Sequence, residues 1–267
     1  MHNRTSPRPR PNERSTMPTI ASASFAHAPS VWQHDRRFFG GIAVALALTV
    51  LAGFGPTYYF RIIGASPLTT VSGVPVTLLV HTHAVLFTAW VLLFIAQTVL
   101  IAQHKVAMHR YLGTAGAALA LLMVVAGALT AINQAARGVA PAGFDPYQFL
   151  MIPLSDVLLF GGFVAAALRL RANREAHKRL MLLAYVCIVT AAIGRLPGVL
   201  PLGPAVFFSL SLLFVLAGVI YDKASRGRVH PAYVWGGTIL VISVPLRLLI
   251  SGTETWTRFA YWIASQV

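Results

Sequence analysis

Acidic residues and cysteines are scarce in this chain. Only 10% of its residues are charged, and 7 Asp and Glu stand against 21 Lys and Arg. A water-soluble domain usually carries about a quarter charged residues, so the composition excludes an ordinary soluble fold. The shortage of acids also excludes carboxylate-rich di-iron chemistry, which needs several acidic side chains inside a helical bundle.

Several motifs with known chemistry are also missing. The single cysteine, Cys187, excludes an intramolecular disulfide and a Cys-x-x-Cys motif for zinc or haem attachment. The chain has no glycine-rich phosphate loop, no His-Glu-x-x-His motif and no Ser-His-Asp order typical of a hydrolase. Cys187 lies within an apolar run, so we expect it to be a buried apolar side chain.

Apolar residues dominate what is present. They make up 57% of the chain, and the mean hydropathy is +0.70. About 20 apolar residues in a helix cross the roughly 30 Å hydrocarbon core of a bilayer. The sequence therefore predicts an all-α, polytopic transmembrane bundle of seven spans, forming one domain over residues 35–267. The predicted spans are Phe38–Phe60, Val76–Gln103, Gly113–Asn133, Tyr147–Leu168, Arg179–Leu200, Ala205–Tyr221 and Tyr233–Ile250.

Basic residues follow an alternating pattern along the loops. They gather before the first span and in the second, fourth and sixth loops, whereas the other loops hold little beyond Arg61 and Arg137. The positive-inside rule then places the N-terminus in the cytoplasm and the C-terminus outside, with Trp256 and Trp262 at the outer interface. We expect residues 1–34, rich in Arg, Pro and Ser, to be a disordered basic cytoplasmic tail. The net charge of +14 is thus explained by the bilayer as partner, without nucleic acid.

Ionisable groups inside a bilayer are costly, which makes them the first candidates for function. On this topology His81, His83, Asp156, Arg195 and Arg247 lie at similar depth near the outer side, and the last three each have a proline within three residues. Prolines free backbone carbonyls, which membrane proteins tolerate around cavities or inside protein. We predict an outward-facing polar pocket. Asp156 would form a structural pair with Arg195 or Arg247. Alternatively, because two arginines accompany one aspartate, one positive charge is left uncompensated and would bind a haem propionate, a carboxylate or a quinone oxygen.

The His81-Thr82-His83 segment has the composition of a metal motif but an unsuitable spacing. Positions two apart on a helix differ by about 200°, so both rings cannot reach one ion on a regular helix. One helix face instead combines His83 with aromatic residues and an amide, which suits either a flat aromatic cofactor or plain packing. The residues of this face are His83, Phe87, Trp90, Phe94 and Gln97.

Further histidines lie at the predicted cytoplasmic surface. His109 precedes the third predicted span and His177 the fifth, and two histidines on facing helices can be the axial ligands of a b-type haem. His177 and Arg195 are eighteen residues apart, five helical turns, so we expect both on one inward face of the fifth span. The candidate metal or haem ligands are therefore His81, His83, His109 and His177, unless they contact lipid headgroups or cap loops.

These residues form a pattern that resembles a group of bacterial multi-pass membrane proteins of unknown function. It consists of His83, Gln97, the segment His109–Gly113, the segment His177–Met181 and then Arg195. The resemblance covers the second to fifth spans and implies a bacterial inner-membrane protein, without implying an activity. A looser similarity is to two-haem b-type membrane cytochromes, although the chain offers no clear second outer histidine on another helix.

Three hypotheses remain open from the sequence. The first is a redox protein that binds haem b or a transition metal and exchanges electrons with quinone or another respiratory membrane protein. In it, Arg195 and Arg247 would neutralise an anionic group and Asp156 would orient a donor or carry a proton. The second is a small-solute or proton-coupled transporter with Asp156 and Arg195 as its switching pair. The third is a non-catalytic accessory or assembly subunit.

Overall fold

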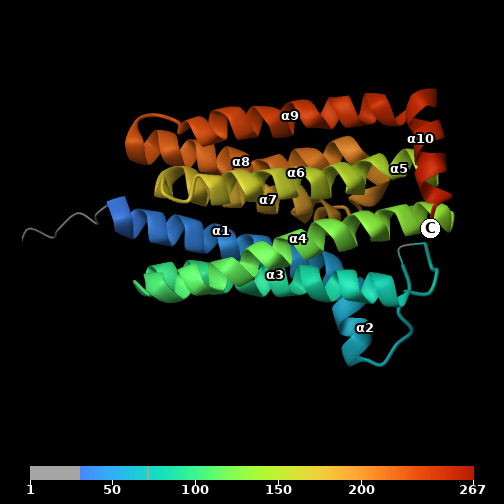
Figure 1. Ribbon diagram of the computed structural model, residues 1–267, viewed down its shortest axis with the longest axis horizontal. Coiled ribbons are helices and arrows are strands. Elements are labelled where there is room, and N and C mark those ends of the chain that lie inside the picture. Colours follow the sequence, from blue (N-terminus) through green and yellow to red (C-terminus); the bar gives the residue numbers. More distant parts are fainter. Residues whose placement is uncertain (1–30, 71) are drawn as a thin grey trace, which may run out of the picture.

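The computed structural model describes residues 31–70 and 72–267, and in this range it contains seven helices long and apolar enough to cross a membrane (Figure 1). The chain is thus an all-α, multi-pass membrane protein, as predicted. Its long helices are α1 (Val31–Phe54), α3 (Leu78–Ala102), α4 (Val106–Ala136), α6 (Met151–Arg169), α7 (Arg174–Ile193), α8 (Pro204–Arg226) and α9 (Pro231–Ser251). The shorter elements are η1 (Gly55–Tyr59), α2 (Phe60–Ile63), α5 (Pro146–Phe149), η2 (Leu200–Leu202) and α10 (Glu254–Ala264).

The prediction of a disordered tail over residues 1–34 falls almost entirely outside the described residues. The helix α1 begins at Val31, a few residues before the predicted start of the bundle at residue 35. We call the end of the bundle where α1 begins the N-terminal end, and the end that carries α10 the C-terminal end (Figure 1).

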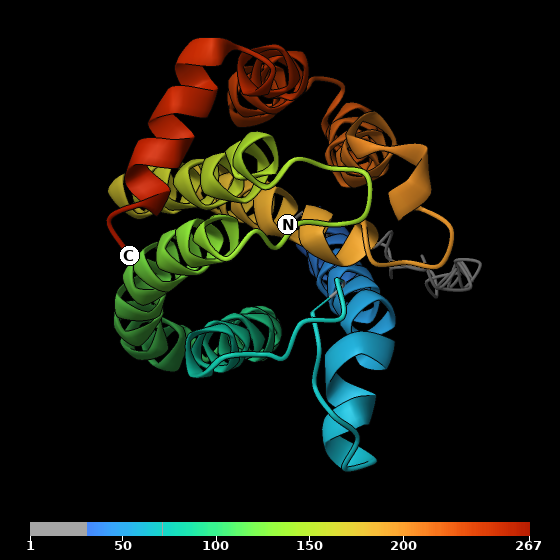
Figure 2. The same ribbon diagram turned by 90° about the vertical axis from the view of Figure 1, so that its right-hand side faces the viewer.

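The helix α7 occupies the middle of the bundle and packs against α6, α1, α8 and α9 (Figure 2). Its side chains are almost entirely covered by protein, among them Leu183 and Val189, which have no exposed surface. Gly236 of α9 lies directly against Leu183 of α7, so a β-carbon there would overlap the leucine. Small residues at such crossings let helix backbones approach closely where no hydrophobic force drives association.

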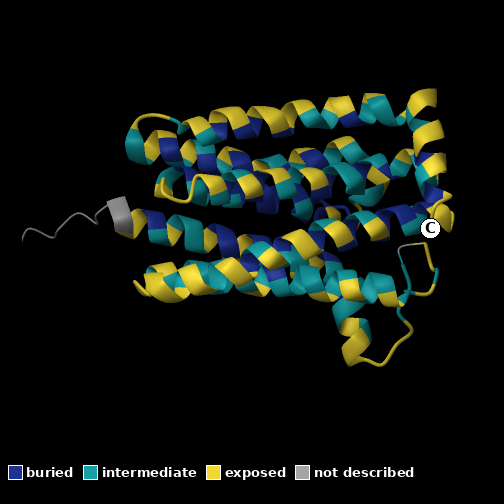
Figure 3. Ribbon diagram, in the orientation of Figure 1, coloured by how far each residue is buried: buried dark blue, intermediate teal, exposed yellow. Residues whose placement is uncertain are grey.

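Exposed residues cover the outside of the bundle and buried residues line its interior (Figure 3), and many of the exposed residues are large and apolar. Leu92, Leu121 and Leu249 are each more than 60% exposed. A continuous apolar surface of this kind would be unfavourable in water but is satisfied by lipid tails. The arrangement therefore explains how so much apolar sequence can surround a small protein core.

The C-terminal end contains two features that the sequence did not predict. Gly55 to Tyr59 form a π-helix that contains Pro56, and α2 then leaves the bundle. The chain ends in α10, which lies across the bundle end (Figures 1 and 2). Trp256 of α10 donates a hydrogen bond from Nε1 to the carbonyl of Tyr147 at 3.0 Å, and Trp262 is 58% exposed, so aromatic residues lie where an interfacial belt is expected.

Several predicted span ends differ from the structure by five residues or more. The helices α4 and α7 begin at Val106 and Arg174, so His109 and His177 lie inside these helices rather than before them. The fifth span does not continue to Leu200, because α7 ends at Ile193 and is followed by Gly194, Pro197 and Gly198, the last with a φ of +77°. The sixth extends five residues beyond Tyr221, since α8 ends at Arg226. The earlier end of α7 moves Arg195 out of the helix, and the later end of α8 brings Asp222 into one.

The orientation of the bundle is a prediction that can be tested directly. The connections at the N-terminal end carry most of the basic residues, including Lys105, Arg171 and Arg228, so we expect that end in the cytoplasm. A protease added to intact spheroplasts should remove an epitope tag placed after Val267. Protection of this tag, together with cleavage of a tag in the loop of residues 103–105, would reverse the topology.

Candidate functional site

A cavity of about 300 Å³ lies toward the C-terminal end of the bundle. It is bounded by α1, α3, α4, α6 and α7, and the loops at that end line its rim. Its walls are mainly apolar, with Val80, Phe87, Phe149 and Ile188 among them. The volume falls at the lower end of the range of small-molecule sites, which is about 300 to 1,000 Å³.

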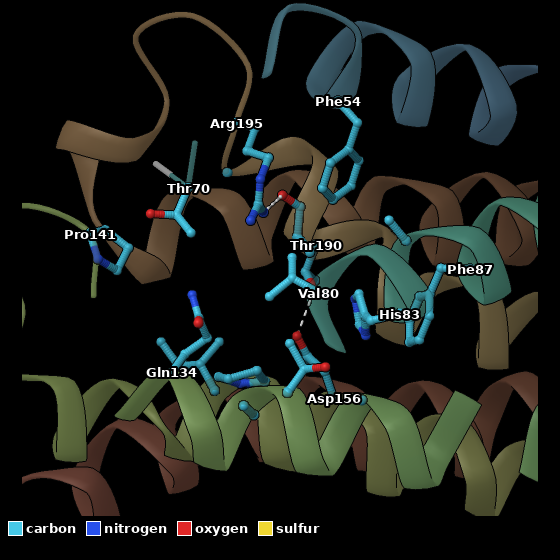
Figure 4. A pocket seen from close by; sticks show the side chains of 18 of the residues that line it. Phe54, Thr70, Val80, His83, Phe87, Gln134, Pro141, Asp156, Thr190 and Arg195 are labelled. Atoms are coloured by element: carbon cyan, nitrogen blue, oxygen red, sulfur yellow. Dashed lines mark hydrogen bonds between the residues drawn. The ribbon is translucent and has the colours of Figure 1, made fainter. Parts of the chain in front are cut away.

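Arg195 reaches the cavity from the segment after α7 (Figure 4). Its Nη1 donates to the carbonyl of Ala191 at 2.6 Å, and its guanidinium lies 4.5 Å from the ring centroid of Phe54. Within the described part of the chain, Arg195 forms no salt bridge. An arginine has five N–H donors, so most of them remain available. The prediction that Arg195 shares a helix face with His177 is wrong, because the helix ends before Arg195.

His83 and His81 point to different surroundings, as their spacing predicted. The ring of His83 lines the cavity and stacks on Phe87 with centroids 4.0 Å apart (Figure 4). His83 Nδ1 is buried and has no hydrogen-bond partner among the described residues. His81 Nδ1 instead lies 3.0 Å from the hydroxyl of Tyr58, with which it forms a hydrogen bond. The π-helical segment of residues 55–59 positions this tyrosine.

Asp156 lines the cavity, but its charge is compensated by protein. Arg247 Nη1 donates to Asp156 Oδ1 at 2.5 Å, and Thr190 donates to Oδ2 at 2.7 Å. Arg247 is also held by Ser243 and lies over the ring of Phe208. Of the two structural pairs expected from the sequence, the structure forms Asp156 with Arg247. The switching pair of the transporter hypothesis, Asp156 with Arg195, is not formed here.

Two further cavity residues were missed in the sequence. Tyr185 is 1% exposed and Thr130 is 9% exposed, and the hydroxyls of both lack a partner in the described part of the chain. Buried hydroxyls are normally hydrogen-bonded. A tyrosine in the middle of the apolar stretch of α7 was the signal available for Tyr185. Thr130 gave none, because threonine hydroxyls in helices often bond to the preceding turn.

The remaining predicted ligands lie at the other end of the bundle. His109 of α4 and His177 of α7 lie close together, with nearly perpendicular rings whose centroids are 6.4 Å apart. Gln97 of α3 donates from Nε2 to the carbonyl of His109 at 3.2 Å. The predicted site residues therefore form two groups. The group at the cavity comprises His83, Asp156 and Arg195, with His81 and Arg247 beside it, and the second comprises His109 and His177.

A buried ionic network, also missed in the sequence, holds the N-terminal end together. Arg179 and Asp222 are both fully buried, and Arg179 Nε donates to Asp222 Oδ2 at 2.8 Å. Asp35 of α1 binds Lys178 and Arg226 at 2.5 and 2.7 Å. Glu175, which forms a salt bridge with Arg179, is the third acidic residue of this network. The network joins α1, α7 and α8 and contains three acids and three bases.

The fold and the cavity define a multi-pass α-helical membrane protein with a largely apolar cavity near one end. Hydrogen-bond donors reach this site from α3, α4, α7 and the segment after α7. In the described ranges, no group of three or more His, Cys, Asp or Glu residues could hold a metal ion. Comparisons with protein families, with characterised proteins and with solved structures gave no match.

Proposed function

We propose that this membrane protein binds a lipid-soluble molecule of the quinone class in the cavity at its C-terminal end. The observation that carries the proposal is Arg195, a cation without a carboxylate partner among the described residues, beside an apolar cavity. An arginine in such surroundings favours a ligand with acceptor oxygens. The apolar walls favour a ligand whose remaining atoms are apolar.

The other polar groups support a ligand with more than one acceptor. The hydroxyls of Thr130 and Tyr185 and the Nδ1 atom of His83, which have no partner within residues 31–70 and 72–267, come from three different helices. A quinone carries two carbonyl oxygens on opposite sides of a flat ring, so it can use donors on separate walls. A single carboxylate would need donors that converge at one point. The rings of Phe54 and Phe87 offer aromatic surfaces to such a ligand.

Haem or a metal ion fits this cavity less well. His83 is the sole imidazole among the described residues that line it, whereas a bis-histidine haem needs two imidazoles. Asp156, the acid in the cavity wall, is already bound by Arg247 and Thr190. These residues therefore suit an organic ligand held by hydrogen bonds rather than by coordination.

Binding of a short-chain quinone to the detergent-solubilised full chain, followed by titration calorimetry, tests the proposal. We expect saturable binding at one site, weakened at least about tenfold by Arg195→Gln, because a hydrogen bond from a charged donor contributes about 1.5 to 3 kcal/mol. Tyr185→Phe should also weaken binding while leaving thermal stability unchanged, since it removes a hydroxyl with no protein partner.

Arg258→Gln is the matched control, because Arg258 lies at the same end of the bundle but is 78% exposed and bound only to Glu254. It should bind quinone with unchanged affinity. Absence of saturable quinone binding to the native protein would contradict the proposal. So would binding of decanoate in place of quinone, which would assign the cavity to an anionic amphiphile.

A further inference from the structure

The N-terminal end of the bundle contains a second group of unpartnered polar atoms, separate from the cavity. His109 Nδ1 and Gln97 Oε1 are both buried and lack a hydrogen-bond partner among the described residues. Gln97 Nε2 donates to the carbonyl of His109, which holds the amide beside the first turn of α4. Buried acceptors without partners are rare in native structures, so each requires an explanation.

His177 has the orientation expected of a metal-binding histidine. Its Nδ1 lies 2.8 Å from the carbonyl oxygen of Ala167 on α6. A carbonyl can only accept, so Nδ1 carries the proton and the lone pair belongs to Nε2. Histidines that bind metals almost always donate their other ring nitrogen to a carbonyl or carboxylate in this way, which sets the tautomer and the ring orientation.

The distance between the two rings suits a shared ion. The centroids of His109 and His177 are 6.4 Å apart, with the rings nearly perpendicular. Metal–imidazole bonds are about 2.0 to 2.1 Å long, so two rings that bind one ion from opposite sides have centroids roughly 6 Å apart. Imidazole nitrogen is a preferred ligand of iron, copper, nickel and zinc.

From these contacts we propose that His109 and His177 together bind one transition-metal ion. Three helices contribute: α4 and α7 supply the imidazoles, and Gln97 of α3 binds the backbone carbonyl of His109. The ion can be bare or can be the iron of a haem, because both use the same pair of imidazoles. Basic residues within four positions of the two histidines in the sequence, Lys105, Arg110 and Arg174, favour haem, whose two carboxylates would offset their charges.

The proposal does not depend on quinone binding, since the two sites share no residue. It is tested by elemental analysis of the full chain purified in detergent, and by the absorbance of its pyridine haemochrome. We expect about one transition-metal ion per chain. A haemochrome band of equal amount identifies haem, and metal without that band identifies a bare ion. His109→Ala and His177→Ala should each lower metal affinity by at least about tenfold.

His104→Ala is the control, because His104 lies in the exposed turn between α3 and α4 at the same end and should leave metal content unchanged. Added imidazole should restore metal to His177→Gly, which separates loss of a ligand from loss of the fold. The proposal is overturned if the native protein holds less than about a tenth of an equivalent after incubation with hemin, copper, nickel and zinc. Unchanged metal content in both histidine variants would also overturn it.

Discussion

Replacing Gly53 by alanine is expected to destabilise the bundle by more than about 3 kcal/mol, the upper end of typical overpacking costs. Gly53 lies where α1 crosses α7, and a β-carbon there would overlap the carbonyl oxygen of Ala192 and come within 2.7 Å of its carbonyl carbon. These atoms belong to backbone, so no side-chain rotation can relieve the overlap. The helices must move apart, and unfolding in mixed micelles titrated with SDS measures the cost.

The same change should weaken ligand binding in any protein that remains folded. Phe54, the next residue, supports the guanidinium of Arg195, so moving α1 away from α7 moves one wall of the cavity. Gly41→Ala is the matched control in the same helix, because nothing lies within 4 Å of its β-carbon position. It should change the unfolding free energy by less than about 1 kcal/mol. Equal stability of Gly53→Ala and Gly41→Ala would contradict the close contact between α1 and α7 at Gly53.

Asp222→Leu is expected to destabilise the protein by about 3 to 5 kcal/mol, the cost of breaking a buried ion pair by removing one partner. The change leaves Arg179 fully buried with Glu175 as its remaining acidic partner. It also removes the acceptor for the backbone N–H of His230, at the start of α9. The five charged residues that remain in the network would carry one uncompensated positive charge.

The double variant Arg179→Met with Asp222→Leu should recover at least half of this loss, because it removes one charge of each sign and leaves the network neutral. The exposed pair of Glu254 and Arg258 provides the comparison. Both residues are 78% exposed, so Glu254→Ala should change stability by less than about 1 kcal/mol. A double variant as unstable as Asp222→Leu alone would mean that packing, rather than charge balance, governs this end.

The seven spans were predictable because each consists mainly of apolar residues over a length fixed by bilayer thickness. The aromatic face from His83 to Gln97 was also predictable, since helical periodicity determines which residues lie together. In the structure Trp90 and Phe94 of this face pack against Phe160 and Tyr185, while Gln97 contacts the start of α4.

The ends of the helices could not be predicted as well. The predicted spans placed Arg179 at the start of the fifth span and Asp222 just beyond the sixth, because hydropathy is low at the start of α7 and falls before α8 ends. Their mutual neutralisation, which depends on helices far apart in sequence, allows both to be buried. The π-helix at residues 55–59 and the end of α7 at Ile193 likewise depend on individual proline and glycine residues. Hydropathy averaged over a whole span does not detect their effect on the backbone.

The amino-acid sequence alone determined the class of protein, since the length and alternation of its apolar runs depend only on local composition and on the bilayer. It also determined which side chains are too polar to face lipid. Only the tertiary structure decided how those side chains are partnered. Arg247 rather than Arg195 neutralises Asp156, and His109 meets His177 while His81 turns to Tyr58. Such pairings arise from the relative rotation and crossing of whole helices, which no single segment of the chain specifies.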